Sequence, residues 1–461
     1  MIILGTNSIK DTGYDVANSC RFNDGDSAQM QKDATSSDSI VDATISMWVK
    51  RGTLGTAQVL LAGNYKSSDL YFCSLSFDSS DRLSFKNSDN GTNCEFVTNR
   101  VFRDCSAWYY ICVECDLSDS AADRVKIYIN GTTRETSFST STNMSGDQFF
   151  LGKSGYEVGV GALQDASYFD GYMAEVCYID GNAAGSPLTP SSFGEYDEDT
   201  PTVWKPKNVS GLSFGANGFY LDFEDSSNLG NDANGGTDLT VTNLAATDQA
   251  TDTCTNNFCT MNPLVPTTNI TFSEGNCKMV TSSSDTHGGG IGTFGLTAGK
   301  WYWEVKIASL VANHNHGVIS ELTSELYQNA AALQNDTGVT CWRNDDGGEM
   351  VVDGSATSND YGLFTDGQIM GIALDMDNYN ISIYRNGSAL VTDFNMSTTR
   401  GVIFPMINTG ISTTSEVNFG GCPAFTISSA QSDANGYGNF EHAPPSGYLA
   451  LCSKNLGSDG G

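Results

Sequence analysis

Two histidines stand two positions apart, at His314 and His316. In an extended strand, side chains two positions apart point to the same side, so both imidazoles would face one way. A zinc site needs three or four ligands, and no third His or Cys lies nearby in the sequence. We therefore expect a polar loop whose histidines contribute to ligand binding, and a metal site is the alternative.

A tryptophan and an arginine stand beside acidic residues in the run CWRNDD, residues 341–346. The ring of Trp342 offers a large rigid contact area, and the guanidinium of Arg343 directs paired hydrogen-bond donors. Together with Asp345, these are the residue types that recognition surfaces use. We expect the three to bind a ligand, with Arg343 and Trp342 most exposed to it. The alternative is that Trp342 is partly buried in the core.

Paired carboxylates suggest a second kind of chemistry, hydrolysis by a general acid and base. Asp375 and Asp377 straddle a turn, where Asp side chains bond to nearby backbone N–H groups. A polysaccharide-cleaving site needs an inward-facing acid pair. Glu175 is the nearest candidate, and no partner stands at strand spacing from it. Because motifs for a nucleophilic serine, a phosphate loop or an activated cysteine are also missing, we expect no enzyme.

The net charge is −31, from 23 basic and 54 acidic side chains. Without a Lys/Arg cluster, direct binding to nucleic acid or to an anionic membrane is not expected. Such acidity favours solubility and mutual repulsion. We expect no cofactor, and calcium held by some of the carboxylates is the alternative.

No hydrophobic run reaches transmembrane length, and the opening Met1-Ile2-Ile3-Leu4 is too short for a signal peptide, so we expect a soluble protein without membrane insertion. The 13 cysteines are irregularly spaced. We expect most of them to be reduced and buried. A disulfide between Cys254 and Cys259 is the alternative for that pair.

Short strands must position these residues. Residues 366–387 contain an apolar strand, an acidic turn and an alternating strand that ends at Asn386-Gly387. Asn-Gly suits a two-residue hairpin turn because both positions accept a positive φ. Upstream, Trp301 and Trp303 share one strand face with aliphatic residues, which predicts buried core rather than a sugar platform. Since no long amphipathic stretch exists, we expect an all-β chain of two or three domains.

The run 366–387 resembles the central signature of SPRY (B30.2) domains. Residues 299–307 resemble the first strand of that family, and residues 404–406 and 417–420 resemble its closing strands. The resemblance implies a β-sandwich that binds ligands through its loops and catalyses nothing. It also places the run at 341–346 where such domains carry variable ligand loops.

The first half resembles a laminin-G-like or concanavalin-A-like jelly roll. Four runs carry this resemblance in the right order, namely residues 46–50, 108–113, 124–132 and 169–181. Members of that family bind glycans or proteins, and some hold calcium. The fold class expected is therefore two tandem β-sandwiches, a concanavalin-A-like jelly roll followed by a SPRY-like sandwich.

The expected organisation has four parts. They are an N-terminal arm at residues 1–15, the first sandwich at 16–185, extra strands and linker at 186–270, and the SPRY-like sandwich at 271–461. The arm lacks the apolar content to fold by itself, and such arms order against a partner. We therefore expect a homo-oligomer.

The segments 218–232 and 239–264 resemble virion structural proteins of marine tailed bacteriophages. The resemblance implies localisation in the virion, with other virion proteins as partners. We expect a non-enzymatic fibre or adhesin that recognises a host-surface glycan or protein through its sandwich loops. The alternatives are a head-decorating protein that binds capsid subunits and a polysaccharide-cleaving enzyme on the jelly-roll fold.

Overall fold

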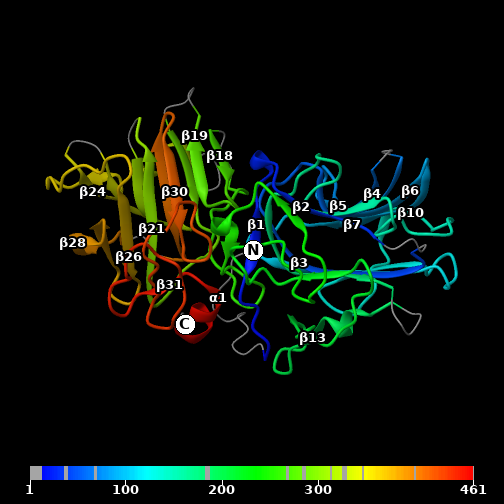
Figure 1. Ribbon diagram of the computed structural model, residues 1–461. Helices are drawn as coiled ribbons and strands as arrows, with labels where there is room; N and C mark the ends of the chain where they lie inside the picture. The colour runs from blue at the N-terminus through cyan, green and yellow to red at the C-terminus, as the bar shows by residue number, and fades with distance from the viewer. Residues whose placement is uncertain are drawn as a thin grey trace. The chain divides into compact units, whose positions relative to one another are not determined.

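The computed structural model of the chain describes residues 13–35, 40–66, 70–181, 187–265, 269–282, 287–311, 314–323, 330–344, 347–398 and 401–459. The chain divides into two compact units, with the boundary between Thr255 and Asn256. The regular secondary structure of both units is almost entirely β-strand, mostly antiparallel (Figure 1), so the all-β prediction is confirmed. Residues 1–12 of the expected arm lie outside the described residues.

The first unit contains two large sheets and one small one. The seven-stranded sheet has the order β17 (Gln249–Ala250), β1 (Ser19–Phe22), β12 (Gly171–Asp180), β3 (Asp42–Arg51), β8 (Trp108–Asp116), β9 (Val125–Ile129), with β15 (Phe219–Leu221) also paired to β12. The eight-stranded sheet has the order β10 (Phe138–Thr142), β7 (Thr92–Val101), β6 (Arg82–Asp89), β5 (Tyr71–Phe77), β4 (Gln58–Tyr65), β11 (Tyr156–Val160), β2 (Gln29–Asp33), β16 (Thr240–Thr242). The small sheet pairs β13 (Gly194–Tyr196) with β14 (Trp204–Pro206).

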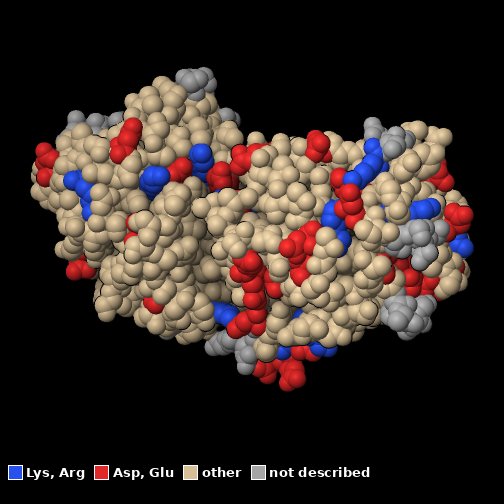
Figure 2. Space-filling model, viewed as in Figure 1, with Lys and Arg blue, Asp and Glu red and all other residues tan. Residues whose placement is uncertain are grey.

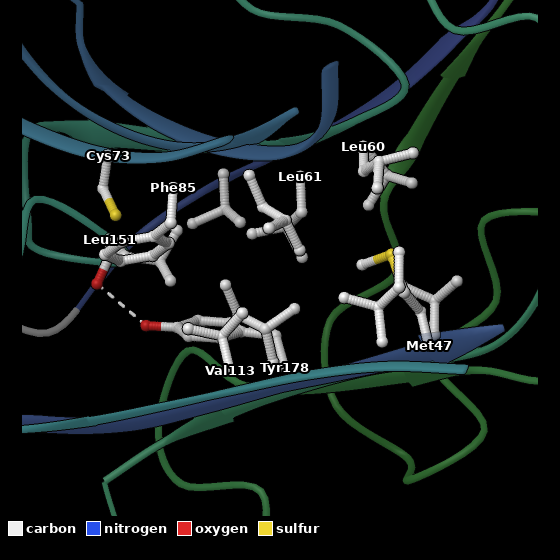
Figure 3. Close-up of a cluster of buried hydrophobic side chains, with 14 of the residues drawn as sticks. Met47, Leu60, Leu61, Cys73, Phe85, Val113, Leu151 and Tyr178 are labelled. Carbon is white, nitrogen blue, oxygen red and sulfur yellow. Dashed lines mark hydrogen bonds between the residues drawn. The ribbon is translucent and has the colours of Figure 1, made fainter. Parts of the chain in front are cut away.

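The two large sheets of this unit enclose its hydrophobic core (Figure 3). Cys73 and Phe85 come from the eight-stranded sheet, and Met47, Val113 and Tyr178 come from the other. The side chains alternate in and out along each strand, which explains the period-two pattern in the sequence. The hydroxyl of Tyr178 is satisfied by the carbonyl oxygen of residue 151, 2.8 Å away. The core therefore holds no unpaired phenol at this point.

The opposite face of the seven-stranded sheet is also buried. Trp48 points to this outer face because its neighbour Met47 points into the core. Trp48 and Tyr110 are only 5% and 1% exposed. β13 and β14 cover them, with the ring of Trp204 5.6 Å from the ring of Tyr110. Residues 250–255 add to this cover, so segments that follow the sandwich in sequence close its outer face.

The second unit is a sandwich of two sheets. One has the order β18 (Ile270–Ser273), β19 (Lys278–Thr281), β30 (Thr414–Asn418), β21 (Lys300–Ser309), β26 (Ile369–Asp375), β27 (Asn380–Arg385), β28 (Ser388–Asn395), with β31 (Leu449–Ala450) parallel to β21. The other has the order β20 (His287–Ile291), β29 (Ile403–Gly410), β22 (His314–Ser320), β23 (Val339–Arg343), β24 (Glu349–Val352), β25 (Ser355–Ala356).

Helices are few and short in the described part of the chain. The single α-helix there is α1 (Ser453–Asp459), and the 3-10 turns are Asp24–Asp26, Pro190–Ser192, Ala246–Asp248 and Ala330–Asn335. In these ranges we find no helix with the length and apolarity needed to span a membrane. All 13 cysteines are free thiols, so the disulfide between Cys254 and Cys259 does not form.

The predicted core strand and hairpin are both present in the second unit. Trp301 and Trp303 are at most 1% exposed and lie in the core between the sheets. β27 and β28 are joined at Asn386 and Gly387, which have φ values of 46° and 77°. Both residues thus adopt the left-handed region that a tight hairpin turn requires.

A buried carboxylate fastens the C-terminal segment to the outer face of β21. Glu304 points away from the core and is 0% exposed. Its two carboxylate oxygens accept hydrogen bonds from the backbone N–H groups of Glu441 and His442, at 2.9 and 2.8 Å, and from the Asn418 amide at 3.1 Å. Residues 439–442 are thereby held over the sheet.

Replacing Glu304 by glutamine should destabilise the second unit. One carboxylate oxygen would become an NH2 group that faces backbone N–H donors, so at least one buried donor loses its acceptor. We expect Glu304→Gln to lower the free energy of unfolding by about 3 kcal/mol in denaturant titration of the full chain.

The matched control is Glu416→Gln on the neighbouring strand β30. Glu416 pairs with Lys306 at 3.2 Å, and the two side chains are 14% and 32% exposed. This substitution should lower the free energy of unfolding by less than about 1 kcal/mol. Equal effects of the two substitutions would refute the anchoring role of Glu304.

Candidate functional site

The two histidines lie inside the second sandwich rather than in a loop. His314 and His316 open β22, and both are 0% exposed. Their side chains point the same way, as an extended strand predicts, and Nδ1 of His314 lies 2.8 Å from Nε2 of His316. The expectation of a polar loop at these residues is wrong, because β22 is an inner strand paired on both sides, with β23 and β29.

Burial governs the charge of this pair. It lowers the pKa of His314 to about 3, and burial together with the neighbouring imidazole lowers the pKa of His316 well below its ordinary value. Both rings are therefore neutral near pH 7. One donates its N–H to the other, which leaves His314 Nε2 and His316 Nδ1 without partners among the described residues. Nor do the described residues bring together any three His, Cys, Asp or Glu side chains as a metal site would.

Trp342 is a core residue. It lies on β23, is 0% exposed, and packs against Phe364 with ring centroids 5.5 Å apart. Tyr361 lies above it, with ring centroids 6.0 Å apart. The expectation that Trp342 is exposed to a ligand is wrong and the alternative, burial, is correct, because Tyr361 and Phe364 pack against its ring.

Of the other two residues predicted in this run to bind a ligand, only Arg343 lies among the described residues. The Arg343 side chain is 23% exposed, and its Nε donates to Glu349 Oε1 at 3.0 Å. Its guanidinium is thus already paired across β23 and β24. Asp345 lies outside the described residues. The ligand-binding role assigned to these residues and to the histidines stays a prediction.

The candidate hydrolase carboxylates have structural partners. Asp375 Oδ1 accepts the backbone N–H groups of Asp377 and Asn378, both at 3.0 Å, so it shapes the turn as the sequence predicts. Glu175 sits at a bulge of β12 with a φ of 51° and is 6% exposed. Tyr220 donates to it at 2.9 Å, and burial raises the pKa of Glu175 to about 7.

Tyr14 connects the described end of the expected arm to this carboxylate. Its hydroxyl lies 3.4 Å from Glu175 Oε2 and 3.3 Å from the hydroxyl of Tyr220. Residues 13–15 therefore pack on the first unit. Glu175 is covered by two phenols, an arrangement that stabilises the fold and leaves the carboxylate little access to a substrate.

A groove on the second unit offers a better recognition site. Tyr361 and the β28 residues Leu390–Asn395 line it, and we call it the β28 groove; its volume is about 450 Å³. β28 is the last strand of its sheet, so within the described residues it is paired along one edge only. Tyr361 and Phe394 are half-buried, whereas Asp393 and Asn395 are exposed. The groove thus combines two aromatic rings with a carboxylate and an amide.

Tyr361 is held in place from below and from the side. Its ring rests on Trp342, and its backbone N–H donates to the carbonyl oxygen of Gly348 at 2.8 Å. Arg385 on β27 donates to the carbonyl oxygen of Gly362 and stacks over the ring of Phe364, 4.7 Å away. A rigid aromatic side chain at the surface loses little entropy on binding. Trp342 therefore supports the groove without contacting its contents.

The charge of the molecule limits what the groove can bind. On the face shown in Figure 2, Lys and Arg side chains lie singly or beside acidic ones. Asp393 adds a negative charge to the groove itself, and the whole chain carries −31. A neutral sugar or a polar or basic peptide suits such a groove better than a phosphate-rich ligand.

The sequence contains a weak signal for this groove. Tyr361 stands in a run rich in Gly, Asp, Ser and Asn, residues 353–367, which indicates an exposed loop. The role of Asp393 is harder to anticipate, because it depends on a bulge. Asp393 has a φ of 49° and its N–H bonds to the hydroxyl of Ser382, where the pairing of β27 and β28 is irregular.

Comparison with known families agrees with both folds. Residues 23–181 match the concanavalin A-like lectin/glucanases superfamily, and residues 300–422 match the SPRY domain family. A laminin-G/concanavalin-A-like domain therefore precedes a SPRY domain, as the resemblance implied. No protein of curated function matches the chain.

Similar solved structures include three SPRY domains. The SPRY domain of human HERC1 has 17% sequence identity, covering 32% of this chain and 89% of that one, with a TM-score of 0.26. A human SPRY domain has 16% identity, 32% and 94% coverage and a TM-score of 0.27. The TRIM65 PSpry domain has 13% identity, 35% and 91% coverage and a TM-score of 0.28.

Acid should destabilise the second unit through the buried histidines. Unfolded imidazoles titrate near pH 6.5, whereas the folded pair binds protons only at much lower pH. Below pH 6.5 the unfolded state therefore binds more protons than the folded state. For each histidine, the free energy of unfolding then falls by about 1.4 kcal/mol for every unit by which the pH is lowered. We expect the full-length variant His314→Gln/His316→Gln to lose stability less steeply than wild type between pH 6.5 and 4.5.

The control for this experiment is His442→Gln, at a half-buried ring outside the core. It leaves the buried pair in place, so the loss of stability in acid that this pair causes should persist. If wild type and the double variant show parallel dependence of unfolding free energy on pH, the buried pair is not the source of acid sensitivity.

Trp342 and Arg343 should differ sharply in their effect on stability. Trp342→Ala removes a fully buried ring and should lower the free energy of unfolding by about 3–5 kcal/mol. Arg343→Ala breaks a partly exposed ion pair and should lower it by about 1 kcal/mol. Denaturant titration of both variants measures the difference, and a Trp342→Ala effect as small as that of Arg343→Ala would contradict the buried position.

Proposed function

We propose that the chain is a non-enzymatic recognition protein of a virion, a fibre or adhesin that binds a glycan or protein on the host surface. The observation that carries this proposal is the β28 groove, with its combination of a supported aromatic ring, a carboxylate and an amide. The virion setting rests on the resemblance of residues 218–232 and 239–264 to phage structural proteins.

The chemistry of the β28 groove suits a neutral sugar. The C–H face of a sugar ring stacks on an aromatic side chain, as Tyr361 and Phe394 would allow. Sugar hydroxyls donate to carboxylates and amides, which Asp393 and Asn395 supply at the same place. An extended peptide is the second ligand class that fits, because it can pair with the edge of β28 that has no partner strand among the described residues.

The size of the groove implies weak binding by one copy. A surface groove of about 450 Å³ buries only a small ligand, so a single copy gains little affinity. Several copies on one particle, bound to a surface with repeated ligands, would bind far more tightly through effective concentration. Multivalent display is consistent with the homo-oligomer expected from the N-terminal arm.

The two alternatives receive less support. A polysaccharide-cleaving enzyme would need an accessible acid pair, and Glu175 lies beneath Tyr14 and Tyr220. A head-decorating role would place the contacts on capsid subunits instead of the host. The attachment experiment below separates that role from adhesion, because a decorating protein would not bind host cells by itself.

Removing the Tyr361 ring and the Asp393 charge from the β28 groove should weaken attachment of the protein to host cells. We expect Tyr361→Ala/Asp393→Asn to reduce binding to host cells, or to glycans on an array, by about 10-fold or more. The melting temperature should fall by only about a few degrees, because Asp393 is exposed and Tyr361 is half-buried.

The matched control is Tyr196→Ala in the first unit. Tyr196 is 37% exposed and also packs against a tryptophan, with its ring 4.9 Å from that of Trp204. Its loss should leave attachment unchanged. Equal attachment by wild type and the groove variant would exclude the β28 groove as the binding site.

A further inference from the structure

A lysine and an aspartate are buried together on the outer face of the seven-stranded sheet. Lys50 Nζ lies 2.7 Å from Asp252 Oδ2, and both side chains are 1% exposed. Lys50 belongs to β3, and Asp252 lies in the segment that covers the sheet after residue 250. The two residues are 202 positions apart, so the contact closes most of the first unit into a loop.

Aromatic side chains surround this pair. Trp108 Nε1 donates to the other carboxylate oxygen of Asp252, Oδ1, at 3.0 Å. The Tyr172 ring centroid lies 5.8 Å from Lys50 Nζ, and the Trp108 and Tyr172 rings are 6.4 Å apart. Two opposite charges removed from water in this way carry a large desolvation penalty. A neutral product of the same two groups would escape that penalty.

We infer that Lys50 and Asp252 form an intramolecular isopeptide bond. Proton transfer from Nζ to Oδ2 across their hydrogen bond gives a neutral amine and a neutral carboxylic acid. The nitrogen lone pair then attacks Cγ, a new Nζ–Cγ bond forms, and the Cγ–Oδ2 bond breaks. Two protons from the original ammonium leave with Oδ2 as one water molecule, so an ammonium and a carboxylate become a secondary amide and water, with no change in net charge.

Three features of the site favour this reaction. Both side chains are only 1% exposed, so the two charges lie out of contact with water and the uncharged amide avoids their desolvation penalty. The 2.7 Å contact holds nucleophile and electrophile together, which replaces a bimolecular encounter by an intramolecular one. Negative charge develops on Oδ1 in the tetrahedral intermediate, and the Trp108 N–H is already hydrogen-bonded to that atom. Trp108 is therefore a catalytic residue of the step.

The intact mass of the full-length wild-type protein tests the inference directly. After purification and denaturation, the mass should be lower than the sequence mass by one water, and a tryptic digest should contain one branched species that joins the peptide of Lys50 to the peptide of Asp252. A full sequence mass, with these two peptides recovered separately, would overturn the inference. This measurement needs no variant and so does not depend on how a substitution affects folding.

The pair Lys300–Asp375 in the second unit serves as an internal control. Its N–O distance is also 2.7 Å, but the Lys300 side chain is 36% exposed, so its ammonium keeps contact with water although the Asp375 side chain is only 5% exposed. No branched peptide should join these two residues. If Lys300 and Asp375 were linked as well, burial would not be the controlling factor and the argument given for Lys50 would fail.

A conservative variant tests the part assigned to Trp108. Trp108→Phe keeps an aromatic ring and removes the N–H that donates to Oδ1. The loss of water, followed by intact mass at intervals after cell-free synthesis, should slow by about 100-fold. Bond formation at the wild-type rate would overturn the role of Trp108, and Lys50→Ala should show no loss of water at any time.

Discussion

In each unit, a segment with little regular secondary structure covers the outer face of one sheet, and buried carboxylates hold that segment in place. Both units depend on this cover. In the second unit, Glu304 accepts hydrogen bonds from four donors, and two of them are backbone N–H groups of the covering segment. In the first unit, Asp252 bonds to Lys50 and Trp108. A buried carboxylate is costly unless its oxygens are satisfied, so each of these groups specifies one position of the segment over the sheet.

This architecture restricts where recognition can take place. The aromatic residues of the first unit's seven-stranded sheet, such as Trp48 and Trp108, are covered and cannot stack on a ligand. In the second unit, the described residues pair β28 along one edge only, and the β28 groove lies on this strand beside Tyr361. The core supports Tyr361 through Trp342, so a residue without access to the ligand still determines the geometry of the surface. Core packing and binding are coupled at this point.

The all-β class can be predicted from the sequence because strand periodicity and Asn-Gly turns are local signals, whereas the type and order of the two sandwiches follow from the resemblance to two families. Trp301 and Asp375 have the predicted positions because their patterns are local signals too. The exposure expected for Trp342 is wrong because its burial depends on Phe364, which is 22 positions later in the chain. The loop expected at His314 and His316 is wrong because four polar residues in succession, 313–316, rarely indicate an inner strand. The β28 groove also joins residues distant in sequence, and one of them depends on a bulge that no local pattern predicts.

The covering segments lie C-terminal to the sheets that they cover, which has a consequence for synthesis on the ribosome. Asp252 follows Trp108 by 144 residues. At about 5–20 residues per second, the outer face of the first sheet waits roughly 7–30 s for its cover. During that time its tryptophans and tyrosines are open to chaperones and to neighbouring nascent chains. The first unit therefore completes its fold only when its last residues emerge from the ribosome. The yield of native protein depends on how well the uncovered sheet face is kept from contacts with other nascent chains until then.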